Sequence, residues 1–212
     1  REAVMETAMM HFLYYLFLAV CWCSGNILQA IELPNYTLIL SQSDFQIRLY
    51  NESTWVSARV SGTSFDQSYR NGFQRLYQYI HGANSNSSKI AFTAPALTSV
   101  PSSSSPSGNT YIVRIFISTR FHGKPPLPNP ELKLWIEKWK SRCIAVRKFS
   151  GYANDDNINK EIEALVTTLN KQSITIQDTT SYIIANYNAS SHNTTQRLNE
   201  VWINISGIGT QC

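Results

Sequence analysis

The sequence predicts an α+β fold in which two copies of a ββαββ unit form a curved, mostly antiparallel sheet or barrel flanked by two helices. Short segments of alternating apolar and polar residues are typical of strands that bury one face. Two longer segments have the apolar spacing of helices. A constant shift of 89 residues along the chain places Ser61 on Ser150. The same shift places Ile47 on Ile136, which indicates an internal duplication.

The first unit begins with a candidate β-hairpin. Residues 45–50 (FQIRLY) and 55–60 (WVSARV) alternate apolar and polar side chains, and turn-forming residues lie between them. The elements expected next are a helix and two strands, at residues 64–82, 89–100 and 110–118. The low-complexity segment 101–109 (PSSSSPSGN) is expected to form the loop between these strands.

The second unit repeats this order after a proline-rich linker at residues 122–130. Residues 133–139 (KLWIEKW) and 143–149 (CIAVRKF) form a second candidate hairpin. A helix and two strands are again expected, at residues 155–171, 181–187 and 200–205.

The two predicted helices share an apolar face of different chemistry. In the first helix this face is mainly aromatic and consists of Tyr69, Phe73, Leu76, Tyr77 and Ile80. In the second helix the shift places aliphatic residues at the same positions, namely Ile158, Ile162, Leu165, Val166 and Leu169. Both sets can pack on a sheet. Packing alone therefore does not explain why the first helix is aromatic.

The N-terminal segment, residues 1–25, has the pattern of a signal peptide. Its apolar run, Phe12–Cys23, is too short to span a bilayer and suits the central region of a signal. Cys23 and Gly25 supply the small residues before the expected cut. The alternatives are an uncleaved anchor or a buried apolar helix. We therefore expect a secreted protein without a stable membrane span.

Two further features fit secretion. Six N-x-[S/T] sequons are candidate glycosylation sites, at Asn35, Asn51, Asn86, Asn188, Asn193 and Asn204. Cys143 and Cys212 remain after removal of the signal and can pair in an oxidising compartment. Alternatively, Cys143 is a small buried residue and Cys212 is a loose C-terminal one.

Several other function classes lack their motifs here. The sequence has no glycine-rich phosphate loop, no zinc-type spacing of Cys and His, and no motif for covalent haem attachment. The formal charge of +4 comes from scattered basic residues, which argues against a nucleic-acid surface. The four histidines are isolated along the chain, so we expect no metal site. No catalytic set stands out.

One edge of the first helix combines aromatic rings with polar donors. On a helical wheel Arg70 and His81 lie on one flank of the apolar face, and Gln78 continues that flank. This edge suits a flat apolar ligand with acidic substituents, because aromatic rings contact the plane and an arginine binds a carboxylate. The alternative is that the rings pack on the sheet and Arg70 is solvated.

Several motifs together resemble the SOUL / haem-binding protein family. They are the segment 45–84, KIAFTAPALTSV (89–100), FSGYAND (149–155) and NEVWINI (199–205). Their order and spacing match the family over residues 34–206, expected as one SOUL domain, with residues 207–212 as a C-terminal tail. The resemblance implies a distorted antiparallel β-barrel, pseudo-duplicated and flanked by two α-helices. It also implies the binding of haem or a related tetrapyrrole.

Matching the family's haem contacts residue by residue implies a site on the first helix. Its basic contact falls on Arg70, and two methionine positions fall on Phe73 and Tyr77. A lysine position falls on Gln78. The aromatic replacements can still stack on a macrocycle, whereas the loss of the lysine removes one partner for a carboxylate of the ligand.

The axial histidine proposed for the vertebrate branch of the family falls on Leu49, so that mode of iron ligation is absent. His81, one turn beyond Tyr77, is the candidate substitute for this axial histidine. Together these features predict a secreted carrier or scavenger for a porphyrin, similar to plant members with predicted signals, and not an enzyme. Three alternatives stay open: a module for another hydrophobic ligand, a tetrapyrrole-modifying enzyme, and a partner-binding protein.

Overall fold

The computed structural model describes residues 31–212 except residues 63, 103–108, 188–196 and 207–211. The predicted signal peptide, the sequons at Asn188 and Asn193 and most of the predicted C-terminal tail lie outside the described residues. The described part of the chain contains two α-helices and one ten-stranded sheet.

The two predicted ββαββ units are present. The first unit comprises β2 (Gln46–Tyr50), β3 (Ser53–Ser61), α2 (Phe65–Ile80), β4 (Ala96–Pro101) and β5 (Thr110–Phe116). The second comprises β6 (Leu134–Trp139), β7 (Arg142–Ser150), α3 (Asp155–Lys171), β9 (Ser181–Asn186) and β10 (Leu198–Ser206). The additional elements are β1 (Tyr36–Ser41), β8 (Thr175–Ile176) and the 3-10 turns η1 (Thr119–Phe121) and η2 (Pro130–Leu132).

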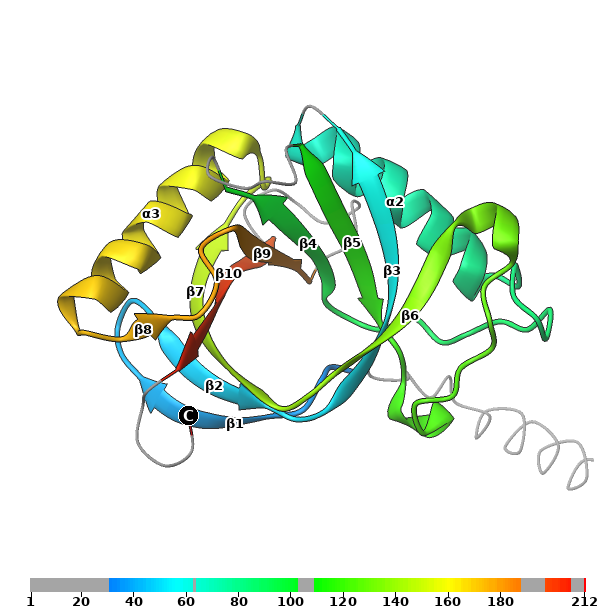
Figure 1. Cartoon of the computed structure of the whole chain (residues 1–212), viewed down its shortest axis with the longest axis horizontal. Helices are drawn as coiled ribbons and strands as arrows, with labels where there is room; N and C mark the ends of the chain where they lie inside the picture. The colour runs from blue at the N-terminus through cyan, green and yellow to red at the C-terminus, as the bar shows by residue number, and fades with distance from the viewer. Residues whose placement is uncertain (1–30, 63, 103–108, 188–196, 207–211) are drawn as a thin grey trace, which may run out of the picture. The chain divides into compact units, whose positions relative to one another are not determined.

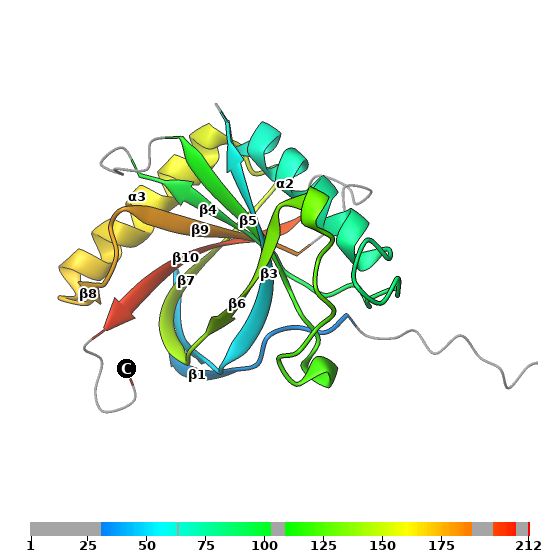
Figure 2. The same ribbon diagram turned by 45° about the vertical axis from the view of Figure 1, so that its right-hand side comes forward.

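The sheet is strongly curled into a half-barrel, and α2 and α3 lie on its outer, convex face (Figures 1 and 2). Its strands follow the order β1-β2-β7-β10-β9-β4-β5-β3-β6, and all of these neighbours are antiparallel. The predicted α+β class and the curved antiparallel sheet with two flanking helices are therefore confirmed.

Successive side chains of each strand point to opposite sides of the sheet, so its two faces carry different residues. On the convex face β7 and β10 pack against α3, whereas β3 and β5 pack against α2. On the concave face the core is rich in large aromatic side chains, including Tyr50, Trp55, Phe116, Trp139 and Trp202. Both faces of the central strands are therefore buried.

The two predicted hairpins do not form. β2 pairs with β7 and β3 pairs with β6, so each expected hairpin is one long, bent strand that passes from one half of the sheet to the other. The register continues across the bend, with Tyr50 opposite Arg142 and Ser53 opposite Trp139. A two-residue hairpin turn needs a positive φ. Neither Asn51 nor the next residue has one.

Two strand predictions differ from the structure in extent. The strand expected at residues 89–100 begins only at Ala96, directly after Pro95. Proline has no N–H to donate to a sheet, which favours a strand that starts beyond it. The edge strand β1 was not predicted, because its side chains are mostly exposed and do not alternate between a buried and an exposed face.

The buried face of α2 is rotated from the predicted apolar face. Phe65, Leu76 and Tyr79 are buried, whereas Tyr77 is 48% exposed. The reason is a close approach of helix and sheet at Gly72, where a Cβ atom would overlap the side chain of Val113. A pattern based on apolar residues does not register glycine as buried. The rotation leaves several aromatic side chains at the edge of the helix.

The two helices are joined at their N-termini. Ser64 caps α2 by accepting a hydrogen bond from a backbone N–H of the first turn. Asp155, the first residue of α3, accepts two hydrogen bonds from the backbone N–H of Phe65, at 3.0 and 3.2 Å. A capping box at Asn154 begins α3 itself. One carboxylate therefore fixes the start of one helix relative to the other.

Gly72→Ala is expected to lower the free energy of unfolding by about 1–3 kcal/mol, because the new methyl group would overlap Val113. At an ordinary helix position the same change stabilises a protein by about 0.5–1 kcal/mol. Urea unfolding followed by circular dichroism measures the difference. Asn71→Ala, at an exposed position of the same turn, is the control and should stay within about 0.5 kcal/mol of the parent. A more stable Gly72→Ala protein would contradict the close approach.

Candidate functional site

A cavity lies along one edge of α2, and we call it the α2 cleft. Its volume is about 460 Å³, which is in the range of small-molecule sites. Its largest apolar side chains come from the helix and from two segments distant in sequence. They are Tyr69, Phe73 and Tyr77 of the helix, Phe92 of the segment after it, and Tyr187.

Aromatic rings form a ladder on this edge of the helix. Tyr69 and Phe73 are stacked, with centroids 5.5 Å apart and planes at 22°. Phe65 stacks on Tyr69 with centroids 6.1 Å apart. Across the cleft, Phe92 meets Phe73 edge to face at 6.2 Å. The four-residue spacing of a helix aligns these rings, so the cleft has a continuous aromatic wall.

A more polar cavity continues from the α2 cleft, and we call it the polar cleft. Its volume is about 350 Å³, and it shares Tyr69, Arg70 and Asn186 with the α2 cleft. Arg197 and Tyr152 also line it. The Arg197 guanidinium lies 3.8 Å from the centroid of the Tyr152 ring and donates to its hydroxyl at 3.0 Å. Two arginines therefore line one cavity.

Arg70 is held by a weak interaction. Its Nη2 atom lies 3.0 Å from Oδ2 of Asp66, one turn earlier on the helix, and its Nε donates to Oδ1 at 3.1 Å, but the two side chains are 75% and 59% exposed. An exposed ion pair of this kind contributes at most about 1 kcal/mol. An anionic group of a ligand can therefore replace Asp66 as the partner of the guanidinium.

The structure brings three of the five predicted ligand residues together. Arg70, Phe73 and Tyr77 line the α2 cleft. Gln78 is exposed and lines neither cleft. His81 follows the last turn of α2, where its ring stacks on Tyr77 with centroids 3.8 Å apart. Its Nδ1 atom lies 2.8 Å from the Tyr77 carbonyl oxygen. His81 therefore supports Tyr77 from outside the cleft.

Other residues of the site were not predicted. Phe92 fell within a segment expected to be a strand, and Tyr187 ended another. Arg197 carried no local signal at all. These residues come from separate segments that only the folded sheet brings beside α2. Leu49, the position matched to the family's axial histidine, packs against the core under α3.

Burial raises the pKa of two tyrosines that line the α2 cleft. It raises the pKa of Tyr69 to about 12, so its phenol is protonated at neutral pH. Burial also raises the pKa of Tyr187 far above its ordinary value, and the Tyr187 hydroxyl donates to Oε2 of Glu200 at 2.7 Å. Tyr187 therefore belongs both to the α2 cleft and to a buried polar network behind it.

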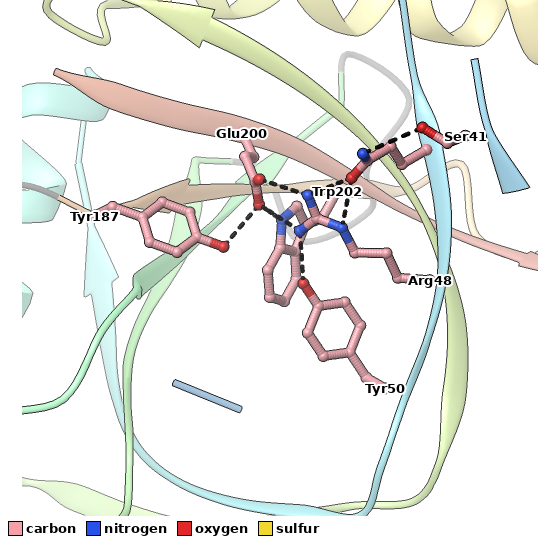
Figure 3. Close-up of polar contacts among 7 residues, drawn as sticks. Ser41, Arg48, Tyr50, Tyr187, Glu200 and Trp202 are labelled. Atoms are coloured by element: carbon pink, nitrogen blue, oxygen red, sulfur yellow. Dashed lines mark hydrogen bonds and ion pairs between the residues drawn. The ribbon is translucent and has the colours of Figure 1, made fainter. Parts of the chain in front are cut away.

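That network lies on the concave face of the sheet (Figure 3). Arg48 donates from Nη2 to Oε1 of Glu200 at 2.9 Å and from Nη1 to Oε2 at 3.1 Å. The Nε1 of Trp202 also donates to Glu200, at 2.8 Å. Tyr50 accepts from Arg48 at 3.0 Å. Arg48 and Glu200 are only 3% and 2% exposed, so the network is a closed structural element and not an open binding site.

The segment Asn199–Trp202 (NEVW) contributes both to the polar cleft and to the buried polar network. Asn199 lines the polar cleft and donates to the carbonyl oxygen of Gly151 at 2.8 Å. Glu200 and Trp202 point to the opposite face of the sheet and form the network. Alternation along β10 thus explains why this short motif combines two different polar residues with a tryptophan.

The described ranges contain neither a metal-binding cluster nor a helix that could span a membrane. No group of three or more His, Cys, Asp or Glu side chains is placed there to hold a metal ion. Neither of the helices described has the length and apolar character that crossing a membrane requires.

Comparison with known proteins finds a matching family model and several curated relatives. A family model described as SOUL heme-binding protein matches residues 31–204. Heme-binding protein 2 of Mus musculus is 29% identical over 180 residues, covering 82% of this chain and 86% of that protein. Heme-binding protein 1 of Xenopus laevis is 30% identical over 112 residues, covering 52% and 58%.

Solved structures with the same fold are more distant in sequence. The C-terminal domain of EcmrR has a TM-score of 0.56 at 11% identity and covers 82% of this chain and 99% of that domain. A hydrolase from Listeria innocua has a TM-score of 0.54 at 8% identity, covering 79% and 94%. At these identities the similarity concerns the fold alone.

Glu200→Ala is expected to lower the free energy of unfolding by about 3–5 kcal/mol, because Arg48 would stay buried without its carboxylate partner. The double variant Arg48→Met/Glu200→Leu removes both charges and should recover part of this loss, although the Tyr187 hydroxyl and Trp202 Nε1 still lack their acceptor. Chemical denaturation of the parent and both variants provides the measurement. If the double variant were as unstable as the single one, the unpaired charge would not be the cause.

Proposed function

The chain belongs to the SOUL heme-binding protein family, and from this premise we propose that it binds haem or a related tetrapyrrole reversibly in the α2 cleft. In this proposal the protein is a carrier or scavenger and not an enzyme. The observation that carries it is the aromatic wall of the α2 cleft beside two arginines. The names of the relatives as heme-binding proteins support the same ligand class.

The joined clefts suit the two chemical parts of such a ligand. A tetrapyrrole macrocycle is flat and apolar, and the rings of Tyr69 and Phe73 can stack on it. Its carboxylate side groups would lie toward the polar cleft, where Arg70 and Arg197 are placed to bind them. Arg197 thereby compensates for the family's lysine, which is Gln78 in this chain.

We expect binding to depend on the macrocycle more than on iron. Within the part of the chain that the structure describes, the residues that line the two clefts include no His, Cys or Met, which are common ligands of haem iron. This observation also favours a second candidate function, the binding of another hydrophobic acid without affinity for haem.

We further propose that the protein is secreted and N-glycosylated. The apolar N-terminal segment supports secretion. Cys143 and Cys212 form a disulfide, with Cα atoms 5.6 Å apart, and such bonds persist in oxidising compartments. Asn204 lies half-buried in β10 and suits glycosylation least. The sequon asparagines that are exposed in the described part of the chain are Asn35, Asn51 and Asn86.

Titration with haem is expected to shift the Soret band at micromolar protein. Arg70→Glu should weaken binding about tenfold, a loss of about 1.4 kcal/mol, because it replaces a partner of the ligand carboxylates with a like charge. Asn159→Glu, at the equivalent position of α3, is the control and should bind haem as the parent does.

Protoporphyrin IX distinguishes the two candidate functions. Quenching of tryptophan fluorescence should give it a Kd close to that of haem, because the aromatic wall contacts the ring and not the metal. If neither protoporphyrin IX nor haem bound, the binding of another hydrophobic acid would be the remaining candidate function. A haem affinity far above that of protoporphyrin would show that iron ligation contributes after all.

Replacing both Cys143 and Cys212 by serine is expected to destabilise the protein by about 2–4 kcal/mol. The disulfide closes a loop with a sequence separation of 69 residues, so its loss increases the entropy of the unfolded chain. Urea unfolding of the variant and the parent measures the change. Peptide mapping of the secreted parent without reduction should recover the two cysteines in one linked peptide pair, and two free thiols would contradict the bond.

A further inference from the structure

The duplication gives α3 a cavity equivalent to the α2 cleft, and we call it the α3 cleft. Its volume is about 570 Å³, and it lies along one edge of the helix. Its helix wall consists of Asn159, Ile162, Glu163 and Val166. The shift that places Ser61 on Ser150 equates these residues with four that line the α2 cleft, namely Arg70, Phe73, Gln74 and Tyr77. The same edge of both helices therefore lines a cavity.

The facing walls of the two clefts also correspond. In the α2 cleft Asn186 and Tyr187 come from the end of β9, which belongs to the second unit. In the α3 cleft Pro101 and Ser102 come from the end of β4, which belongs to the first unit. β4 and β9 pair at the centre of the sheet, between the two helices (Figure 1). Each cleft thus combines a helix of one unit with a strand end of the other.

The α3 cleft differs from the α2 cleft in its chemistry. Its apolar side chains include the aliphatic Val100, Ile162 and Val166 and a single aromatic ring, Tyr182. Glu163 stands in place of Gln74, and the equivalent of Arg70 is an asparagine. Among the described residues, its lining contains one carboxylate and no cationic side chain. An anionic macrocycle would therefore meet a like charge and no aromatic ladder.

The charged groups near the cleft differ in their relation to it. Asp178 precedes the lining residue Thr179 but does not line the cavity, and its carboxylate accepts hydrogen bonds from Thr180 and Ser181. Lys160 is an exposed residue of α3 that does not line the cavity. Glu163 is exposed at the rim, where its carboxylate can meet a ligand without prior burial.

We infer that the α3 cleft is a second ligand site, which takes a small aliphatic molecule that carries an ammonium group. The alkyl part is buried against the aliphatic wall, and the ammonium pairs with Glu163. The duplicated fold thus presents two sites of opposite charge preference. This inference does not require that the α2 cleft binds haem.

The test is an NMR titration of the ¹⁵N-labelled protein with n-hexylammonium. We expect saturable shifts of the amide signals of residues 159–166 and 179–182, whereas residues 69–77 stay unchanged. Hexan-1-ol should bind the same place more weakly, and hexanoate more weakly still. Glu163→Gln should weaken hexylammonium about two- to fivefold and leave hexan-1-ol unchanged, since it removes an exposed ion pair and no volume.

Three further variants sharpen the test. Val166→Trp fills the cavity and should abolish the binding of both hexylammonium and hexan-1-ol. Lys160→Ala, outside the lining, is the matched control and should not weaken hexylammonium. Asn159→Arg combined with Glu163→Gln copies the residues of the α2 cleft and should reverse the preference in favour of hexanoate.

The inference would be overturned if hexylammonium caused no saturable shifts in residues 159–166 and 179–182, or caused them only in residues 69–77. Equal weakening of hexylammonium and hexan-1-ol by Glu163→Gln would also overturn it, because the carboxylate would then have no specific role. Haem titration of Glu163→Gln keeps the two proposals separate. Its haem affinity should equal that of the parent whether or not hexylammonium binds.

Discussion

The buried ion pair between Arg48 and Glu200 is the interaction on which the curled sheet depends. Arg48 lies on β2 and Glu200 on β10, and the two side chains meet across the intervening strand β7. In the other half of the sheet, Arg114 of β5 and Glu137 of β6 meet across β3 in the same way. The internal shift equates Arg48 with Glu137, so the duplicated position keeps an ion pair with its charges exchanged. Each pair therefore links two strands across the strand between them.

The same duplication explains how one fold holds two clefts of different character. Both helices need an apolar face to cover the sheet, and this need is met by either aromatic or aliphatic residues. The close approach at Gly72 rotates α2 so that Phe73 and Tyr77 lie at its edge and not beneath it. In α3 the larger Glu161 is at the equivalent of Gly72, where it accepts from Nε of Arg147 at 2.7 Å. The aromatic residues Phe73 and Tyr77 of α2 therefore lie at the edge of the helix, and packing on the sheet alone would not require them to be aromatic.

Local patterns predicted the elements well and their partners poorly. The helix expected at residues 155–171 and the duplication were right, because both depend on periodicity along the chain. The hairpins were wrong, because the alternation in residues 45–60 shows that a segment is a strand but does not identify its neighbour. Arg70 and Phe73 were found from the helix wheel. Phe92, Tyr187 and Arg197 could not be found, since only tertiary pairing brings them to the same cavity.

The hydrogen bonds from Phe65 to Asp155 have a mechanical consequence for the two clefts. Because the carboxylate of one helix holds the first turn of the other, neither helix can slide along the sheet without stretching this contact. A displacement of α2 would thus be transmitted to α3. Thermodynamic reciprocity requires that any such coupling act equally in both directions. The Asp155 carboxylate therefore adds a direct link between the two helices to the strand pairs that already join the two units.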